Sequence, residues 1–408
     1  MKTLTLALTA MAHGGAAVGR DPHGKTIFVP GAIPGEQVRV GIVEDKGRYA
    51  RARLLEVLQP AAGRVIPRCP HFGAGCDAHY QHIAYPQQLQ YKQEVVRDQL
   101  RRVGGLNSVV VRPVLPNPQP WQGQVEIRLS PASGGGLGLW AADLGRVIPL
   151  KACYTIRPPL LELLQDVDLE LPGLRHATLR VGDGDALLVT LVTENAEPPQ
   201  LEADFPVSVA LVLPDGTAAT LIGDPYLAQT VKGREFRVSA GAFFHPSPPA
   251  ADLLVDAVVT YAALTGGETL LELYSGVGLL TAFLSPQAAV VVCVEANPDA
   301  VGDAAVNLEE TDNVSLYEGR VEDILPALVV EPEVVVVDPP AAGLPMVVIE
   351  EIGRRPPQRL IYVSSDVGSL ARDGRQLAAA GFRLVEVQPV DMFPQSFHVQ
   401  TISLWRPL

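Results

Sequence analysis

The sequence predicts an α/β protein with a doubly wound parallel sheet, preceded by a small β-barrel and a mixed α/β central domain. Residues 1–59 hold short strand-like runs broken by glycine and proline, as in small barrels. Residues 106–240 hold several strand-like runs and one helical segment, residues 158–167. From residue 241, strand, glycine loop and helix alternate, which is typical of a doubly wound sheet. Because 408 residues exceed one hydrophobic core, several domains are expected.

The charge is distributed unevenly along the chain. The net charge of -13 argues by itself against a nucleic-acid partner. However, residues 1–105 hold 14 Lys+Arg and 8 Asp+Glu, a net of +6, whereas the remainder carries a net of -19. This asymmetry indicates a basic binding module attached to an acidic body, with chance clustering as the alternative.

Neither export nor membrane insertion is expected. In residues 3–9, leucine alternates with the small residues threonine and alanine, which favours a first β-strand over a signal peptide. No run reaches the roughly 18 uninterrupted apolar residues that a membrane span needs. The four cysteines are scattered and do not form a disulfide framework, so we expect a protein of the reducing cytoplasm.

Three arginines mark a candidate RNA-binding face in the N-terminal segment. Strand-like runs occupy residues 3–9, 25–30, 37–43 and 50–58. Arg48, Arg51 and Arg53 fall on or beside the last run, with Tyr49 between them, and alternation puts Arg51 and Arg53 on one face. Guanidinium groups beside an aromatic ring suit a phosphate backbone with an unstacked base. A solvated strand face is the alternative.

The segment Phe28-Val29-Pro30-Gly31-Ala32-Ile33-Pro34-Gly35-Glu36 resembles the TRAM module. That module is an OB-like RNA-binding barrel preceding the catalytic part of many RNA (uracil-5-)-methyltransferases. The resemblance covers nearly the whole chain. It implies a TRAM/OB-like barrel over residues 1–59 and an RNA partner, ribosomal or transfer. We expect the chain to be a monomer.

Residues 60–105 resemble the segment in which this family binds an iron–sulfur cluster, followed by a linker helix over residues 87–103. Cys69 matches the first cluster cysteine and Cys153 the last, while Gly75 and Ala78 stand at the middle pair and Cys76 is one position out of step. A four-iron cluster normally takes four thiolates. We therefore expect these three cysteines to be remnants of a site without its cluster.

The remaining cysteine and three histidines are the other candidate metal ligands. The remaining cysteine, Cys293, lies in an apolar run and reads as a buried small hydrophobe. His71, His79 and His82 could join Cys69 and Cys76 around zinc, but the spacing is not a recognisable zinc pattern. No metal site is therefore predicted.

Residues 269–295 predict a cofactor site. An apolar strand over residues 269–274 leads to Gly276 and Gly278, and a second strand over residues 288–294 ends at Glu295. The glycines allow a ligand to approach the backbone, and the carboxylate can accept hydrogen bonds from ribose hydroxyls. Thr281 stands where a dinucleotide site would have a third glycine, which favours S-adenosylmethionine over NAD.

The resemblance implies that residues 241–408 form a class I methyltransferase domain that binds S-adenosylmethionine. It implies cofactor contacts for Tyr274 and for the carboxylate of Asp338-Pro339-Pro340. Three further cofactor positions depart from the family or vary within it. They are His245 in place of glutamine, Leu279 in place of a polar residue, and Arg320.

The two catalytic positions of the resembled family carry different chemistry here. In that family a cysteine thiolate adds to uracil C6 and a glutamate removes the C5 proton, whereas this chain has Ser365 and Gln400. A thiol with a pKa of about 8.5 supplies thiolate near neutral pH, serine is far less acidic, and glutamine accepts no proton. Loss of a general base alone costs about 10²–10⁴-fold. We therefore expect weak or absent 5-methyluridine chemistry.

An active enzyme with different chemistry remains the alternative. Transfer to a ring nitrogen or a ribose oxygen needs no covalent adduct, and Asp338, His245 or Asp366 are the candidate bases. Residual activity at uracil C5 is a third possibility.

Overall fold

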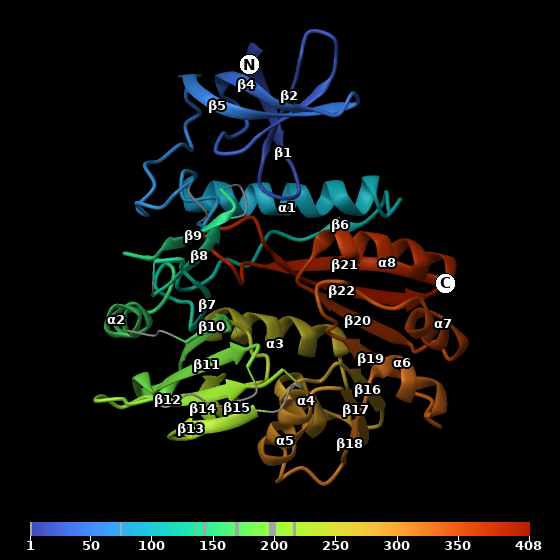
Figure 1. Cartoon of the computed structure of the whole chain (residues 1–408). Coiled ribbons are helices and arrows are strands. Elements are labelled where there is room, and N and C mark those ends of the chain that lie inside the picture. Colours follow the sequence, from blue (N-terminus) through green and yellow to red (C-terminus); the bar gives the residue numbers. More distant parts are fainter. Residues whose placement is uncertain are drawn as a thin grey trace.

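The computed structural model describes residues 2–73, 76–134, 136–141, 144–167, 171–195, 201–214 and 218–408. Figure 1 shows the N-terminal barrel at one end of the molecule, with a long helix, α1, running beneath it. Beyond α1 lie two large sheets, one built from the middle of the chain and one from its C-terminal part. The expected α/β architecture with an N-terminal barrel is confirmed.

The N-terminal strands close into a barrel in the order β1-β2-β3-β5-β4. Alternate apolar residues such as Leu6, Leu8 and Val40 are buried inside it, which is the period of a strand with one face in the core. Arg51 and Arg53 point outward on either side of buried Ala52, as the alternation predicted. The strands are β1 (Thr3–Met11), β2 (Ala17–Arg20), β3 (Thr26–Val29), β4 (Gln37–Asp45) and β5 (Tyr49–Gln59).

Helix α1 (Tyr85–Arg102) joins the barrel to the C-terminal part. Tyr91 and Val95 pack into the barrel core, whereas Val96 and Leu100 pack into the core of the C-terminal sheet. Pro86 occupies its first turn, where the missing N–H costs no hydrogen bond. Within the described residues, no helix is both long enough and apolar enough to cross a membrane.

The middle of the chain forms a seven-stranded sheet in the order β13-β12-β11-β10-β7-β8-β9. Its pairs are antiparallel except β11 with β12, and α2 (Pro158–Asp166) covers part of it through Leu160 and Leu163. A separate hairpin, β14 with β15, follows. The strands are β7 (Glu126–Pro131), β8 (Leu137–Ala141), β9 (Arg146–Pro149), β10 (Leu174–Val181), β11 (Leu187–Thr193), β12 (Ser208–Val212), β13 (Ala218–Ile222), β14 (Tyr226–Val231) and β15 (Arg234–Ser239).

The C-terminal sheet has eight strands in the order β18-β17-β16-β19-β20-β22-β21-β6. The first five are parallel and wind outward in both directions from β16, as predicted for a doubly wound sheet. Strand β6, from the range expected for the central domain, pairs with β21 at the edge. The strands are β6 (Val110–Val111), β16 (Thr269–Leu273), β17 (Val290–Glu295), β18 (Val314–Glu318), β19 (Val334–Val337), β20 (Arg359–Ser364), β21 (Phe382–Val390) and β22 (Gln400–Pro407).

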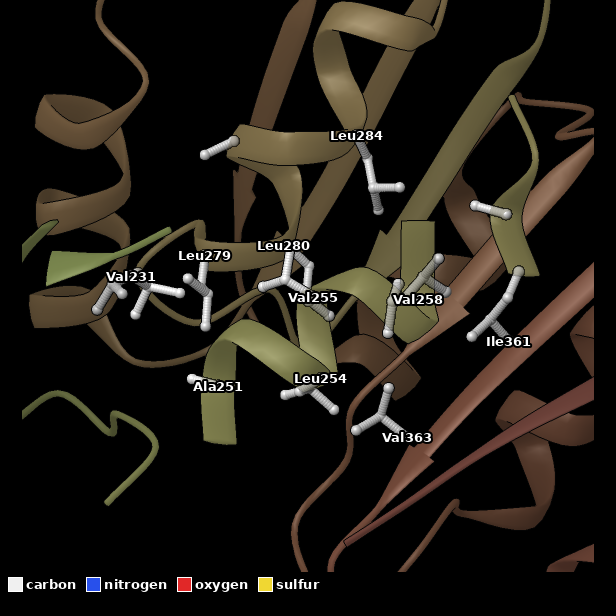
Figure 2. Packing of buried hydrophobic residues seen from close by; sticks show 14 of the residues in the cluster. Val231, Ala251, Leu254, Val255, Val258, Leu279, Leu280, Leu284, Ile361 and Val363 are labelled. Carbon is white, nitrogen blue, oxygen red and sulfur yellow. The ribbon is translucent and has the colours of Figure 1, made fainter. Parts of the chain in front are cut away.

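Helices cover both faces of this sheet. Figure 2 shows Leu254 and Val258 of α3 packed near Leu280 of α4 and Ile361 and Val363 of β20. This buried cluster includes Leu279, the first residue of α4. The helices are α3 (Pro248–Ala262), α4 (Leu279–Leu284), α5 (Pro298–Asn307), α6 (Val321–Ile324), α7 (Met346–Arg354) and α8 (Val367–Ala379).

A buried ion pair fixes the segment between β21 and β22. Lys92 of α1 pairs with Asp391, and neither side chain is exposed. Lys92 Nζ also donates to Phe393 O at 2.9 Å, and Tyr85 OH donates to Asp391 Oδ2 at 2.7 Å. Charges removed from water in this way need such partners, so α1 determines where the segment lies.

We predict that Lys92→Met destabilises the fold strongly, because it leaves Asp391 buried without its cation. The expected loss is about 3–5 kcal/mol, measured by denaturant unfolding. Arg102→Met on the same helix is the matched control, since Arg102 pairs with Asp98 at the surface. The control should cost about 0–1 kcal/mol. Equal effects of the two substitutions would contradict this view of the segment.

Candidate functional site

A cavity of ≈ 660 Å³ opens at the carboxyl ends of the parallel strands. This is the usual ligand position in a doubly wound sheet, next to the strand where the winding reverses. Most of the residues predicted from the sequence line it together: Tyr274, Gly276, Leu279, Glu295, Arg320, Asp338, His245, Ser365 and Gln400. Gly278 lies at the start of α4, and Arg48, Arg51 and Arg53 lie on the barrel.

The strand register explains why these residues meet. Leu273 pairs with Val294 on one side and with Val337 on the other. Tyr274, Glu295 and Asp338 each come one residue later, so they lie at one level on neighbouring strands. Parallel strands place their carboxyl ends at a single edge, and three separate parts of the chain therefore share one cavity wall.

The turn after β16 is strained and contains unpaired hydroxyls. Tyr274 has a φ of 63°, unusual for a residue with a side chain, and Gly276 and Gly278 have φ of 56° and 84°. Strained backbone of this kind is often found at binding sites. Tyr274 Oη and Ser275 Oγ are buried without a hydrogen-bond partner among the described residues. Both residues line the cavity, but the two hydroxyl oxygens are themselves buried beside it.

The Glu295 carboxylate is oriented by three backbone donors. The N–H of Gly276 donates to Oε2 at 2.9 Å, and the N–H groups of Ala296 and Asn297 donate to Oε1 at 2.8 Å each. Oε2 therefore keeps acceptor capacity toward the cavity. A fixed carboxylate in this position can receive hydroxyl groups of a ribose.

Thr281 has a structural role that explains the missing glycine. Its hydroxyl donates at 2.7 Å to the carboxyl of Glu272, which is buried under the turn. Burial raises the pKa of Glu272 to about 8. A glycine at position 281 would leave this carboxyl group without that donor.

Asp338 and His245 form a second polar pair in the cavity. His245 Nε2 lies 3.7 Å from Asp338 Oδ2, and their side chains are 7% and 19% exposed. Burial raises the pKa of Asp338 to about 7 and lowers that of His245 to about 4. The histidine is therefore neutral near pH 7, and the carboxyl group can exchange a proton there.

Ser365 and Gln400 face one another across two antiparallel strands. Ser364 of β20 pairs with Thr401 of β22, and Ser365 and Gln400 are the next residues along this ladder. Both line the cavity that the cofactor positions share. Residues 35 positions apart in the sequence thus stand at neighbouring points of one wall.

Asp366, the third candidate base, is engaged elsewhere. It caps α8 by accepting a hydrogen bond from the N–H of Ser369 at 2.7 Å, and it lies 3.2 Å from His13 Nε2 of the barrel. The hydrogen bond from His13 is the main cause that lowers the pKa of Asp366 to about 2. Asp366 is therefore a poor base for an attacking group or for the neighbouring Ser365 hydroxyl.

The cysteine segment does not fit an iron–sulfur cluster. The Cys76 thiol hydrogen-bonds to Cys69 and lowers its pKa to about 5, while Cys153 Sγ lies 3.2 Å from the Thr155 hydroxyl. Gly75 lies outside the described residues. No group of three or more metal-ligating side chains occurs in the part of the chain that the structure describes. The segment thus offers three thiols where a four-iron cluster takes four thiolates.

Two aromatic residues of the cavity were not singled out from the sequence. Phe243 is 66% exposed and packs edge-on against His245, with ring centroids 5.4 Å apart. Phe393, whose backbone oxygen accepts a hydrogen bond from Lys92 Nζ, also lines the cavity. Phe243 lies two residues before His245, a position predicted from the resemblance, and this was the available signal for it.

Comparisons with known proteins agree with this architecture. Residues 2–55 match the family model of the TRAM domain. The chain is 30% identical over 435 residues to an uncharacterised RNA methyltransferase of Halalkalibacterium halodurans, covering 97% of this chain and 94% of that protein. It is 31% identical over 438 residues to another from Thermosynechococcus vestitus, covering 98% and 97%.

The fold is also similar to a solved structure, the Pyrococcus abyssi tRNA (uracil-54, C5)-methyltransferase in complex with S-adenosyl-L-homocysteine. The TM-score is 0.74 at 22% identity, over 98% of this chain and 100% of that chain. This similarity confirms the S-adenosylmethionine-dependent methyltransferase fold of the C-terminal sheet. Together with the two relatives, it leads to one conclusion: the chain belongs to the family of RNA methyltransferases with an N-terminal TRAM domain.

Proposed function

We propose that this chain binds S-adenosylmethionine in the cavity and RNA through its barrel, without forming 5-methyluridine by the covalent route of the family it resembles. One observation carries the proposal. The two positions where that route needs a thiolate and a carboxylate line the cavity as Ser365 and Gln400. The RNA is ribosomal or transfer RNA, and the protein acts as a cytoplasmic monomer.

The cavity suits a cationic, ribose-containing ligand. Its wall carries the carboxyl groups of Glu272, Glu295, Glu322 and Asp338 and one guanidinium, that of Arg320. Even with Glu272 and Asp338 protonated, the remaining charges are negative overall. S-adenosylmethionine brings a sulfonium, which this charge attracts, and supplies the methyl group. Phosphate groups would be repelled, so an RNA backbone has to stay outside the cavity.

Individual groups fit parts of this cofactor. Three backbone N–H groups orient Glu295 so that its carboxylate can accept ribose hydroxyls. Leu279, almost fully buried, adds an apolar contact at the start of α4. The fit thus depends on backbone geometry and carboxylates, which the replacements at 245 and 279 leave in place.

The covalent route lacks its nucleophile. All four cysteines belong to the described residues, and none of them lines the cavity. Cys293 lies two residues before Glu295 of the cavity wall, but it is fully buried in β17, and burial raises the pKa of its thiol. A serine can replace a thiol as the nucleophile only when a base activates its hydroxyl group. The adjacent Asp366 already binds His13 and the N–H of Ser369.

A second candidate function has specific support from Asp338. Its carboxyl group lies in the cavity beside neutral His245 and ionises near pH 7. Such a group could accept the proton that a ring N–H or a ribose O–H loses as the methyl group moves from sulfur to that atom. This transfer needs neither a thiolate at 365 nor a carboxylate at 400.

We predict that Glu295→Gln weakens S-adenosylmethionine binding about tenfold or more, because an amide accepts ribose hydroxyls less well than a charged carboxylate. Titration calorimetry measures the effect. Glu318→Gln is the matched control, since Glu318 pairs with Glu295 on the neighbouring strand but is exposed outside the cavity. Equal affinities of wild type and Glu295→Gln would rule out this cofactor position.

We predict that wild-type protein incubated with labelled S-adenosylmethionine and total RNA yields no labelled 5-methyluridine on nucleoside analysis. The double variant Ser365→Cys/Gln400→Glu should gain it, because thiolate and base return to one wall. Either single variant should remain about 10²–10⁴-fold less active than the double variant. A 5-methyluridine peak from the wild type would refute the proposal.

If another labelled nucleoside forms instead, its rate should depend on Asp338. A base works only when ionised, so the rate should rise with pH through about 7 and then level off. Asp338→Asn should reduce the rate by about 10²–10⁴-fold. A pH profile that is flat between about 6 and 8 would exclude Asp338 as the base.

A further inference from the structure

The turn between β1 and β2 of the barrel reaches the C-terminal domain beside the cavity. Residues 12–16 form a tight loop in which the N–H of Ala12 donates to Ala16 O at 2.9 Å and the N–H of Gly15 to Ala12 O at 3.1 Å. From this loop, His13 Nε2 approaches Asp366 Oδ2 to 3.2 Å. Asp366 immediately follows Ser365, which lines the cavity.

The same turn also contacts the segment before Gln400. A Cβ built at Gly15 would lie 2.8 Å from Phe397 Cδ1, so the ring packs directly against the glycine. The other side of Phe397 contacts the His79 ring, with centroids 4.9 Å apart, and Phe397 packs against the barrel core. Phe397 precedes Gln400 by three residues.

One turn of the barrel thus holds both segments that carry the cavity's nucleophile and base positions. Asp366 is also the cap of α8, so its position is fixed from both sides. Phe397 is held between the turn and the cysteine segment. Through these contacts, the turn fixes the barrel against the two segments that place Ser365 and Gln400 in the cavity wall.

We propose that the turn of residues 12–16 is a positioning element that docks the barrel so that RNA bound to it presents one nucleotide to the cavity. This inference rests on the proposed function, since it requires RNA on the barrel and a nucleotide in the cavity. One RNA held at two places binds more tightly than through either contact alone, provided that the geometry lets both form together. The turn sets that geometry.

Two neighbouring glycines provide a sharp test. Gly14 and Gly15 have φ of 90° and 82°, so alanine strains the backbone similarly at either position. At Gly14 the new Cβ meets nothing within 4 Å, whereas at Gly15 it meets Phe397. Gly14→Ala therefore controls for strain, and the difference between the variants reports the docking contact.

The probes are bulk transfer RNA, a single-stranded RNA hexamer as the short probe, and S-adenosylhomocysteine. Gly15→Ala should weaken binding of bulk transfer RNA about tenfold relative to Gly14→Ala, as measured by fluorescence anisotropy. Affinities for the hexamer and for S-adenosylhomocysteine should stay unchanged. Adding Phe397→Leu to Gly15→Ala makes room for the methyl group and should restore most of the lost affinity.

A second pair of variants avoids any change of backbone. His13→Ala removes the contact with Asp366, and His23→Ala is its control, since His23 lies on the exposed turn between β2 and β3. His13→Ala should weaken binding of bulk transfer RNA in the same direction and by less. If wild-type protein binds no RNA, the proposed function fails and this inference fails with it. If wild type binds but Gly15→Ala matches Gly14→Ala, only the docking inference is overturned.

Discussion

The shared carboxyl edge of the C-terminal sheet is the constraint on which the rest of this protein depends. Parallel pairing of β16, β17 and β19 brings Tyr274, Glu295 and Asp338 to one level. Antiparallel pairing of β20 with β22 then adds Ser365 and Gln400 to the same wall. Cofactor positions and the positions of Ser365 and Gln400 therefore share one cavity wall. The function of this wall follows from its side chains and not from the fold alone.

Much of this arrangement could be predicted from the sequence because its signals are local. The strands predicted over residues 269–274 and 288–294 are observed as Thr269–Leu273 and Val290–Glu295, since short apolar runs that end at a turn have few alternatives. Gly276 and Glu295 were predicted to belong to one cofactor site, and in the structure a 2.9 Å hydrogen bond joins them. The resemblance then supplied Ser365 and Gln400, which no local pattern marks. Their roles, and those of the barrel arginines, stay predictions.

Other features lay beyond sequence reasoning because they depend on contacts between distant residues. The short strand β2 was not delimited, since four residues that include Gly19 carry little periodicity. The pairing of β6 with β21 separates that segment from the sheet that follows it in sequence. Nothing near His13 or Gly15 in the sequence indicates Asp366 or Phe397. The ion pair of Lys92 with Asp391 likewise joins residues almost 300 positions apart.

The central claim is that no nucleophile in the cavity can add to a pyrimidine ring. Its most direct measurement uses RNA containing 5-fluorouridine, whose C5 fluorine cannot leave as a proton does, so that any adduct at C6 is retained. Wild-type protein mixed with this RNA and S-adenosylmethionine should run as free protein on a denaturing gel, while the cysteine variant at 365 serves as the positive control. A stable protein–RNA band from the wild type would contradict the account.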